Sequence, residues 1–181
     1  MTSERRREDG SKGWLSGCRY SGMALAAVVG SSAPAVLADE SVLERYLGNW
    51  EMRVRTLQPA KPDIVYKEVY QWVLDRRFIQ GHTDRKPDGT EDLIYGTYDA
   101  GSGGYPFWIF SSSGSYTYLP PAHWDEGKRT MEWKNPSGWD INYFGRCQFP
   151  NANERHCSLI MKDWKGKVLL QQEWSATRLN R

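Results

Sequence analysis

The chain has 181 residues and a formal net charge of +2, and 13% of its residues are aromatic, including nine Trp and ten Tyr. A length of this order indicates one domain, and the aromatic side chains supply ample material for a core. Beyond the first 38 residues the basic and acidic residues balance, 19 against 19. A neutral domain has no electrostatic reason to bind nucleic acid or an anionic membrane.

The first 38 residues differ in kind from the rest of the chain. A charged segment precedes the apolar, small-residue run SGMALAAVVGSSAPAVLA. Val36 and Ala38 stand at the −3 and −1 positions of a cleavage point before Asp39, so residues 1–38 are typical of a cleaved signal peptide. A disordered N-terminal tail is the alternative. Serines and a proline interrupt the apolar run, so no integral membrane protein is expected. The sequence predicts a periplasmic or secreted protein whose mature chain is residues 39–181.

Export changes the cysteine count. Cys18 leaves with the signal peptide, and the mature chain keeps Cys147 and Cys157. These two flank the segment QFPNANERH, which is typical of a hairpin loop, so they can face each other across two strands. An oxidising compartment then favours a disulfide between them, with two separately buried thiols as the alternative. A metal site would need further ligands and only His156 is adjacent, so no metal is expected.

The mature chain begins with one helix and continues as strands. Residues 39–47 have apolar residues at helical spacing. The remainder consists of short runs rich in Val, Ile, Tyr, Trp and Phe between turn residues. We expect about ten strands, at 49–57, 63–74, 77–84, 91–98, 105–112, 115–119, 128–134, 139–148, 156–163 and 167–178. Short links imply an antiparallel meander, and closure removes its exposed edges. The expected fold is therefore all-β, a single barrel wide enough for a small ligand, with a flattened sandwich as the alternative.

The helix passes into the first strand through a Gly-x-Trp triplet made by Gly48 and Trp50. A glycine lets the backbone turn sharply at this point. A short helix, this triplet and a long meander together resemble the calycin superfamily, which includes the lipocalins. The resemblance implies that Trp50 closes one end of the barrel. It also implies that Arg178, in the last strand, stacks across Trp50 in a cation–π contact of about 1–2 kcal/mol.

Four segments narrow this resemblance to the bacterial family called domain of unknown function 1579. They are YLGNWEMRVR, EVYQWVLDRRFIQGHT, LIYGTYDAGSGGY and HWDEGKRTMEW, and the similarity covers most of residues 43–178. The family is similar to calycins in architecture and offers no established activity. The resemblance therefore implies a fold but no catalytic residues, and the pair of cysteines is not among the family's features.

Residues 63–74 supply the first candidates for a ligand site. Tyr66, Glu68, Tyr70 and Trp72 share one face of the expected strand, and this face is the expected interior. A carboxylate among aromatic side chains must be paired or protonated. Glu68 would therefore anchor a ligand or transfer a proton. Pairing with a neighbouring strand near a barrel end is the alternative.

Two further strands complete the candidate site. In 77–84 we expect Gln80 and His82 to face inward, where His82 would bind haem iron or move protons, unless it is a satisfied residue of the rim. In the last strand Gln172 and Trp174 share the inner face. The expected ligand-binding set is Tyr66, Glu68, Tyr70, Trp72, Gln80, His82, Gln172 and Trp174.

The strand expected at 105–112 is apolar on both faces, so a loop or a partner covers its outer side, or that side is an association surface. No phosphate-binding loop or nucleophile elbow is present in the sequence. The sequence predicts an exported, cofactor-free barrel that binds a small apolar or amphipathic molecule in an aromatic-lined cavity. The alternatives are a filled barrel that binds a partner in the cell envelope, and a cofactor-free enzyme that uses Glu68 or His82 for proton transfer.

Overall fold

The structure is a computed structural model that describes residues 37–135 and 140–179. Residues 1–36, which hold most of the expected signal peptide, lie outside the described residues. A short helix precedes ten strands: α1 (Leu37–Glu44), β1 (Gly48–Gln58), β2 (Ile64–Val73), β3 (Phe78–Thr83), β4 (Asp92–Thr97), β5 (Tyr105–Ser111), β6 (Tyr116–Asp125), β7 (Thr130–Lys134), β8 (Ile141–Asn151), β9 (Glu154–Asp163) and β10 (Val168–Arg178). None of the helical residues described is part of a helix long and apolar enough to cross a membrane.

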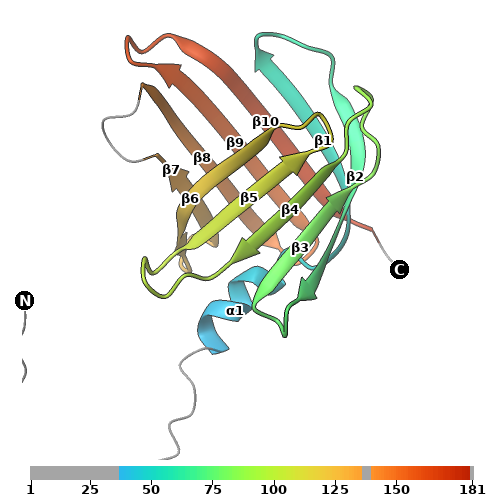
Figure 1. Ribbon diagram of the computed structural model, residues 1–181, viewed down its shortest axis with the longest axis vertical. Helices are drawn as coiled ribbons and strands as arrows, with labels where there is room; N and C mark the ends of the chain where they lie inside the picture. Colours follow the sequence, from blue (N-terminus) through green and yellow to red (C-terminus); the bar gives the residue numbers. More distant parts are fainter. Residues whose placement is uncertain (1–36, 136–139, 180–181) are drawn as a thin grey trace, which may run out of the picture. The chain divides into compact units, whose positions relative to one another are not determined.

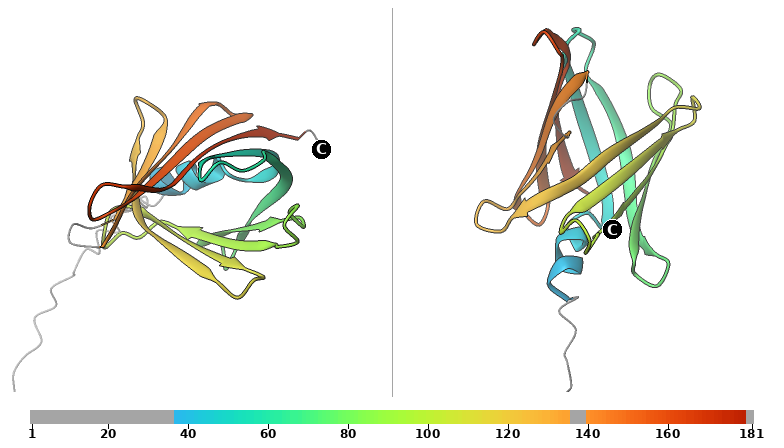
Figure 2. Two further views of the ribbon diagram at one scale, coloured as in Figure 1. Left: turned by 90° about the horizontal axis from the view of Figure 1, so that it is seen from above. Right: turned by 60° about the vertical axis from the view of Figure 1, so that its left-hand side comes forward.

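The strands form one closed antiparallel barrel in sequence order (Figure 1). Each strand pairs with its neighbours along the chain, and β1 pairs with β10 to complete the ring. Figure 2 shows the strands curving around a common interior, with α1 at one end. The predicted all-β meander with a short N-terminal helix is thus confirmed, and the flattened sandwich is not what forms.

Strand ends differ from the prediction mainly at two places. β6 continues through Pro120 and Pro121, where a loop was expected. The register of β5 and β6 shifts beside these prolines, and such an irregularity is where a strand tolerates residues without an N–H donor. The hairpin between β8 and β9 is tighter than expected, because pairing continues to Asn151 and Glu154.

The helix closes one end of the barrel through its apolar face and the residues that follow it. Val42, Leu43 and Tyr46 are buried in the core. Trp50 is fully buried, and its indole N–H donates a hydrogen bond of 2.6 Å to the carbonyl of Tyr46. The guanidinium carbon of Arg178 lies 4.3 Å from the centroid of the Trp50 ring.

Arg178 also explains why a glycine precedes Trp50. Its guanidinium donates hydrogen bonds to the carbonyls of Leu47 and Arg45, at the junction between helix and strand. Gly48 has a φ of 100°, and a Cβ at this position would lie 2.7 Å from the Arg178 Nη1. Gly48 therefore provides both the left-handed backbone and the space that this contact needs.

Cys147 of β8 and Cys157 of β9 lie directly opposite each other and form a disulfide. Both cysteines are buried in the inner face of the wall. This confirms the predicted pairing.

Candidate functional site

The inner faces of the strands enclose a cavity of about 510 Å³. This volume is within the range of pockets that bind small molecules, roughly 300–1,000 Å³. Its walls are mainly apolar and are built from Met52, Val54, Ile64, Ile94, Phe107, Ile109, Leu119, Trp133, Leu159, Met161, Leu170 and Trp174. β1 starts beside α1 and the strands alternate in direction, so the first residues of β2, β4, β6, β8 and β10 lie at the opposite end.

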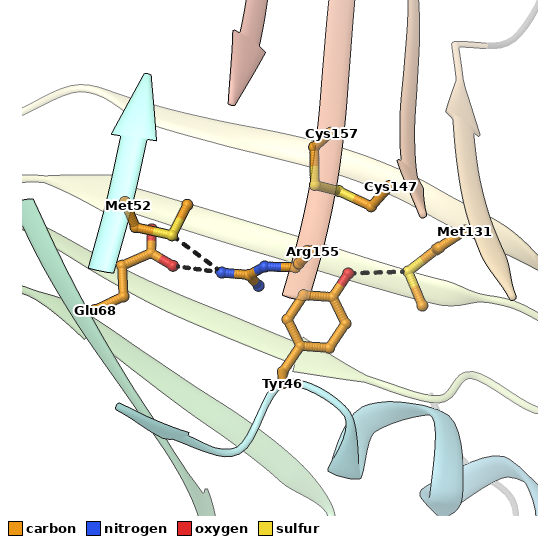
Figure 3. Close-up of a disulfide and its surroundings, with 7 residues drawn as sticks. All are labelled: Tyr46, Met52, Glu68, Met131, Cys147, Arg155 and Cys157. Carbon is orange, nitrogen blue, oxygen red and sulfur yellow. Dashed lines mark hydrogen bonds and ion pairs between the residues drawn. A yellow bond between two sulfur atoms is a disulfide. The ribbon is translucent and has the colours of Figure 1, made fainter. Parts of the chain in front are cut away.

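The floor of the cavity, near α1, is a buried ion pair (Figure 3). Arg155 of β9 extends toward Glu68 of β2, and its Nη2 donates a hydrogen bond of 2.9 Å to the Glu68 Oε2. The two side chains are only 3% and 6% exposed. Three aromatic rings surround the guanidinium, with centroids at 4.9 Å for Tyr46, 5.1 Å for Trp50 and 5.6 Å for Tyr70.

The strand register explains how Arg155 reaches Glu68. Arg155 lies opposite Ala176 of β10, and Ala176 lies opposite Met52 of β1. The small, fully buried Ala176 leaves room for the arginine stem to cross β10 on the inside. The Met52 sulfur contacts the Arg155 Nη2 at 3.3 Å. Glu68 lies on β2, the strand that follows β1 around the barrel.

The positive charge of Arg155 and the negative charge of Glu68 balance each other at the floor of the cavity. Burial is the largest single influence on Arg155 and disfavours its charged form, but the charge of Glu68, smaller contributions of Tyr70 and Tyr46 and the hydrogen bond to Glu68 together outweigh it, and the pKa of Arg155 is raised. Burial is also the main reason why the pKa values of Tyr46, Tyr66 and Tyr70 are raised, and the negative charge of Glu68 adds to the effect. The floor thus consists of one cation, one anion and neutral phenols.

A second ion pair lies at the open end. The Nζ of Lys86 is 2.8 Å from the Oδ2 of Asp92, and these side chains are 13% and 18% exposed. Lys86 also lies 5.8 Å from the centroid of the Tyr66 ring. On the opposite wall the Gln172 amide donates a hydrogen bond of 3.1 Å to the Thr56 hydroxyl.

The structure places five of the expected ligand-binding residues in the cavity lining. They are Tyr66, Glu68, Tyr70, Gln172 and Trp174. Trp72 shares the inner face of β2 but is outside the lining, with the guanidinium carbon of Arg76 at 5.0 Å from its ring.

The expected inward orientation of Gln80 and His82 is wrong. In the β2–β3 ladder Tyr70 lies opposite Gly81, and a Cβ on Gly81 would be 2.4 Å from the Tyr70 ring. The inner position of β3 must therefore be a glycine, and its neighbours point outward. The His82 side chain is 59% exposed and lies 3.8 Å from the Glu91 Oε2.

The same register separates the two groups of the enzyme alternative. Glu68 lies opposite Thr83, which is buried, so the adjacent His82 is on the other side of the sheet. Gln80 donates a hydrogen bond of 2.6 Å to the Tyr95 hydroxyl on the outside. Glu68 and His82 therefore do not contact each other.

Sequence reasoning missed Arg155, because the expected strand began one residue after it. The available signal was parity: Arg155 is two residues before Cys157 and so shares its inner face. Trp133 and Tyr143 also line the cavity and were not among the expected residues.

The outer face of β4, β5 and β6 carries a group of aromatic side chains: Tyr95, Trp108, Phe110, Tyr116 and Tyr118. Phe110 and Tyr116 are 43% and 73% exposed. Association through this outer face of 105–112 stays a prediction.

A second hollow, of about 420 Å³, lies outside the barrel on β1, β8, β9 and β10. Its lining includes Arg53, Arg55, Asp63, Arg146, His156 and Glu173. Arg55 and Arg146 form ion pairs of 3.6 and 3.7 Å with partly exposed carboxylates, as expected of a solvated outer wall. We therefore assign the candidate site to the interior.

Comparison with known proteins supports the architecture alone. No protein-family model matches the chain, and no curated sequence does. The structure is similar to Rv2717c from M. tuberculosis, with 15% identity over 82% of this chain and 99% of that chain and a TM-score of 0.56. It is also similar to the S-type phycobiliprotein lyase CPES from Guillardia theta, with 12% identity, 78% and 93% coverage and a TM-score of 0.47. The similarity to Rv2717c is one of fold alone, that of a closed antiparallel β-barrel.

Proposed function

We propose that this protein binds a small apolar or amphipathic molecule inside its barrel. The observation that carries the proposal is the cavity of about 510 Å³ with mainly apolar walls. Such pockets combine apolar and aromatic walls with a few polar groups that orient the ligand. The volume of this cavity favours ligand binding over the filled, partner-binding barrel that the sequence left as the alternative.

Native mass spectrometry of the gently purified full chain tests this function. An adduct that is lost on denaturation is the expected result, and its mass characterises the ligand. Leu159 lines the cavity, and its neighbour Ser158 is exposed on the outside of the same strand. Leu159→Trp should abolish the adduct, and Ser158→Trp, with the same added bulk, should keep it. A wild-type protein without an adduct, or an adduct that survives in Leu159→Trp, would count against the proposal.

We also propose that the protein is exported and acts in the periplasm or outside the cell. The support is the signal-like segment 1–38 together with the disulfide, because disulfides persist in oxidising compartments. The intact mass of protein recovered from the periplasm should correspond to a chain that starts at Asp39. A full-length chain with reduced cysteines in the cytosol would contradict export.

We propose in addition that the chain belongs to the family called domain of unknown function 1579. This proposal rests on the four sequence segments that resemble the family.

A further inference from the structure

We propose that the cavity selects uncharged ligands, apolar molecules that carry a hydroxyl or carbonyl group, and excludes their carboxylate counterparts. This inference rests on the proposed function, because it specifies the ligand of the same cavity.

The charges that line the cavity leave no cation free for an anionic ligand. Among the described lining residues the cations are Lys86 and Arg155, and the carboxylates are Glu68, Asp88 and Asp92. Arg155 is held by Glu68 at 2.9 Å, and Lys86 is held by Asp92 at 2.8 Å. Asp88 accepts hydrogen bonds from the N–H and hydroxyl of Thr90, outside the pairs. The lining therefore has one more carboxylate than cations.

The floor pair is also inaccessible as an anchor. Its side chains are 3% and 6% exposed, and the guanidinium is covered by Tyr46, Trp50 and Tyr70. A carboxylate ligand would have to displace Glu68 and leave it buried without a partner. Removing a partner from a buried ion pair is costly, because an uncompensated charge remains.

The groups that remain for a ligand are uncharged. Thr117, Tyr143 and Gln172 lie in the cavity lining away from the floor, because Thr117 and Tyr143 are close to the starts of β6 and β8 and Gln172 lies opposite Thr56 near the end of β1. Burial, with a smaller effect of Tyr118, raises the pKa of Tyr143 to about 12, so its phenol stays a neutral donor. A hydroxyl or carbonyl group can pair with such side chains, while the apolar remainder of the ligand fills the cavity toward the floor.

The energetic consequence is discrimination between ligands of equal size. An ion that enters an apolar cavity loses its hydration and must find a compensating charge. An unpaired charge is one of the means by which a site rejects a competitor. The lining offers hydrogen bonds but no counter-ion, so the neutral molecule binds and the anion is rejected.

A matched pair of probes tests the inference on the full chain. Dodecanol and dodecanoate have the same chain length, and their affinities are measured by isothermal titration at neutral pH. We expect dodecanol to bind roughly tenfold tighter or more. Asp92→Asn releases Lys86 from its partner, so dodecanoate should gain and the ratio of affinities should fall by about tenfold. Asp63→Asn is the control, because Asp63 pairs with Arg55 outside the cavity, and there the ratio should not change.

The outcomes separate this inference from the proposed function. Dodecanoate that binds wild-type protein within about threefold of dodecanol overturns the selection but leaves ligand binding intact. A cavity that takes up none of the probes contradicts both. If Asp92→Asn does not fold, Lys86→Gln replaces it: it leaves an unpaired carboxylate, so dodecanoate should bind still more weakly, and a gain of dodecanoate affinity would overturn the inference.

Discussion

Replacing Arg155 by Met should destabilise the barrel by about 3–5 kcal/mol, the range found when one partner of a buried ion pair is removed. The structure gives the reason: Glu68, with a side chain 6% exposed, would lose the hydrogen bond of 2.9 Å that neutralises it. Methionine keeps an unbranched apolar stem against Ala176, so packing is disturbed little. The cation–π contacts of Arg155 with the surrounding rings are lost as well.

Replacing both partners should cost less than replacing one. Apolar residues in place of a buried pair are often neutral or stabilising. The double variant Arg155→Met with Glu68→Met should therefore be close to wild type in stability, so the coupling energy between the two sites should be at least the cost of about 3–5 kcal/mol expected for Arg155→Met alone. Arg146→Met is the matched control, because Arg146 pairs with Glu132 at 3.7 Å and both are more than 40% exposed. That change should cost under about 1 kcal/mol.

Urea unfolding followed by tryptophan fluorescence measures these differences. For a domain of this size a loss of 4 kcal/mol lowers the unfolding midpoint by about 2 M urea. A cost of less than about 1 kcal/mol for Arg155→Met, or single costs that simply add in the double variant, would refute the reasoning.

Three further measurements test other parts of the fold. The most deeply buried of the inner-face phenols with raised pKa values are Tyr46, Tyr66 and Tyr70. A raised pKa stabilises the fold below the unfolded value of about 10, so these three alone should make the unfolding free energy fall by roughly 4 kcal/mol per pH unit above pH ~10; a flat urea-unfolding profile there would contradict this. Gly81→Ala should cost about 1–3 kcal/mol, because its Cβ would be 2.4 Å from the Tyr70 ring, and Gly145→Ala, with its closest contact at 3.6 Å, should cost nothing in thermal unfolding. Replacing Cys147 and Cys157 by Ala removes a link of sequence separation 10 and should cost roughly 2–3 kcal/mol in the same assay, and an unchanged melting temperature would argue against the bond.

The fold could be predicted from the sequence because its signals are local. Turn residues separate the apolar runs, and short links allow only sequential antiparallel pairing. Two strand boundaries were predicted wrongly from composition. The prolines at 120–121 suggested a loop, although β6 accommodates them at a shift of register. The segment PNANE also suggested a longer loop than the tight turn between Asn151 and Glu154.

Site residues were predicted correctly only in strands whose own residue pattern shows which face points into the barrel. In β2 the alternation of aromatic and polar residues identifies the inner face. In β3, Phe78 and Ile79 are adjacent and both apolar, so the pattern allows either face to be the inner one. The pairing of Gly81 with Tyr70 decides between them, and pairing is not visible in a single strand.

The buried ion pair also changes the role of Glu68. A carboxylate on an inner strand face suggests a ligand anchor, but the structure gives Glu68 a partner on β9 that comes from the other side of the β1–β10 closure. Arg155 of β9 and Arg178 of β10 both stack on Trp50, so these contacts link β9 and β10 to the start of β1. We infer that the half of the barrel near α1 stabilises the fold and that the half away from it recognises the ligand. Substitutions at Glu68 should therefore change unfolding more than binding, and substitutions at Gln172 should do the reverse.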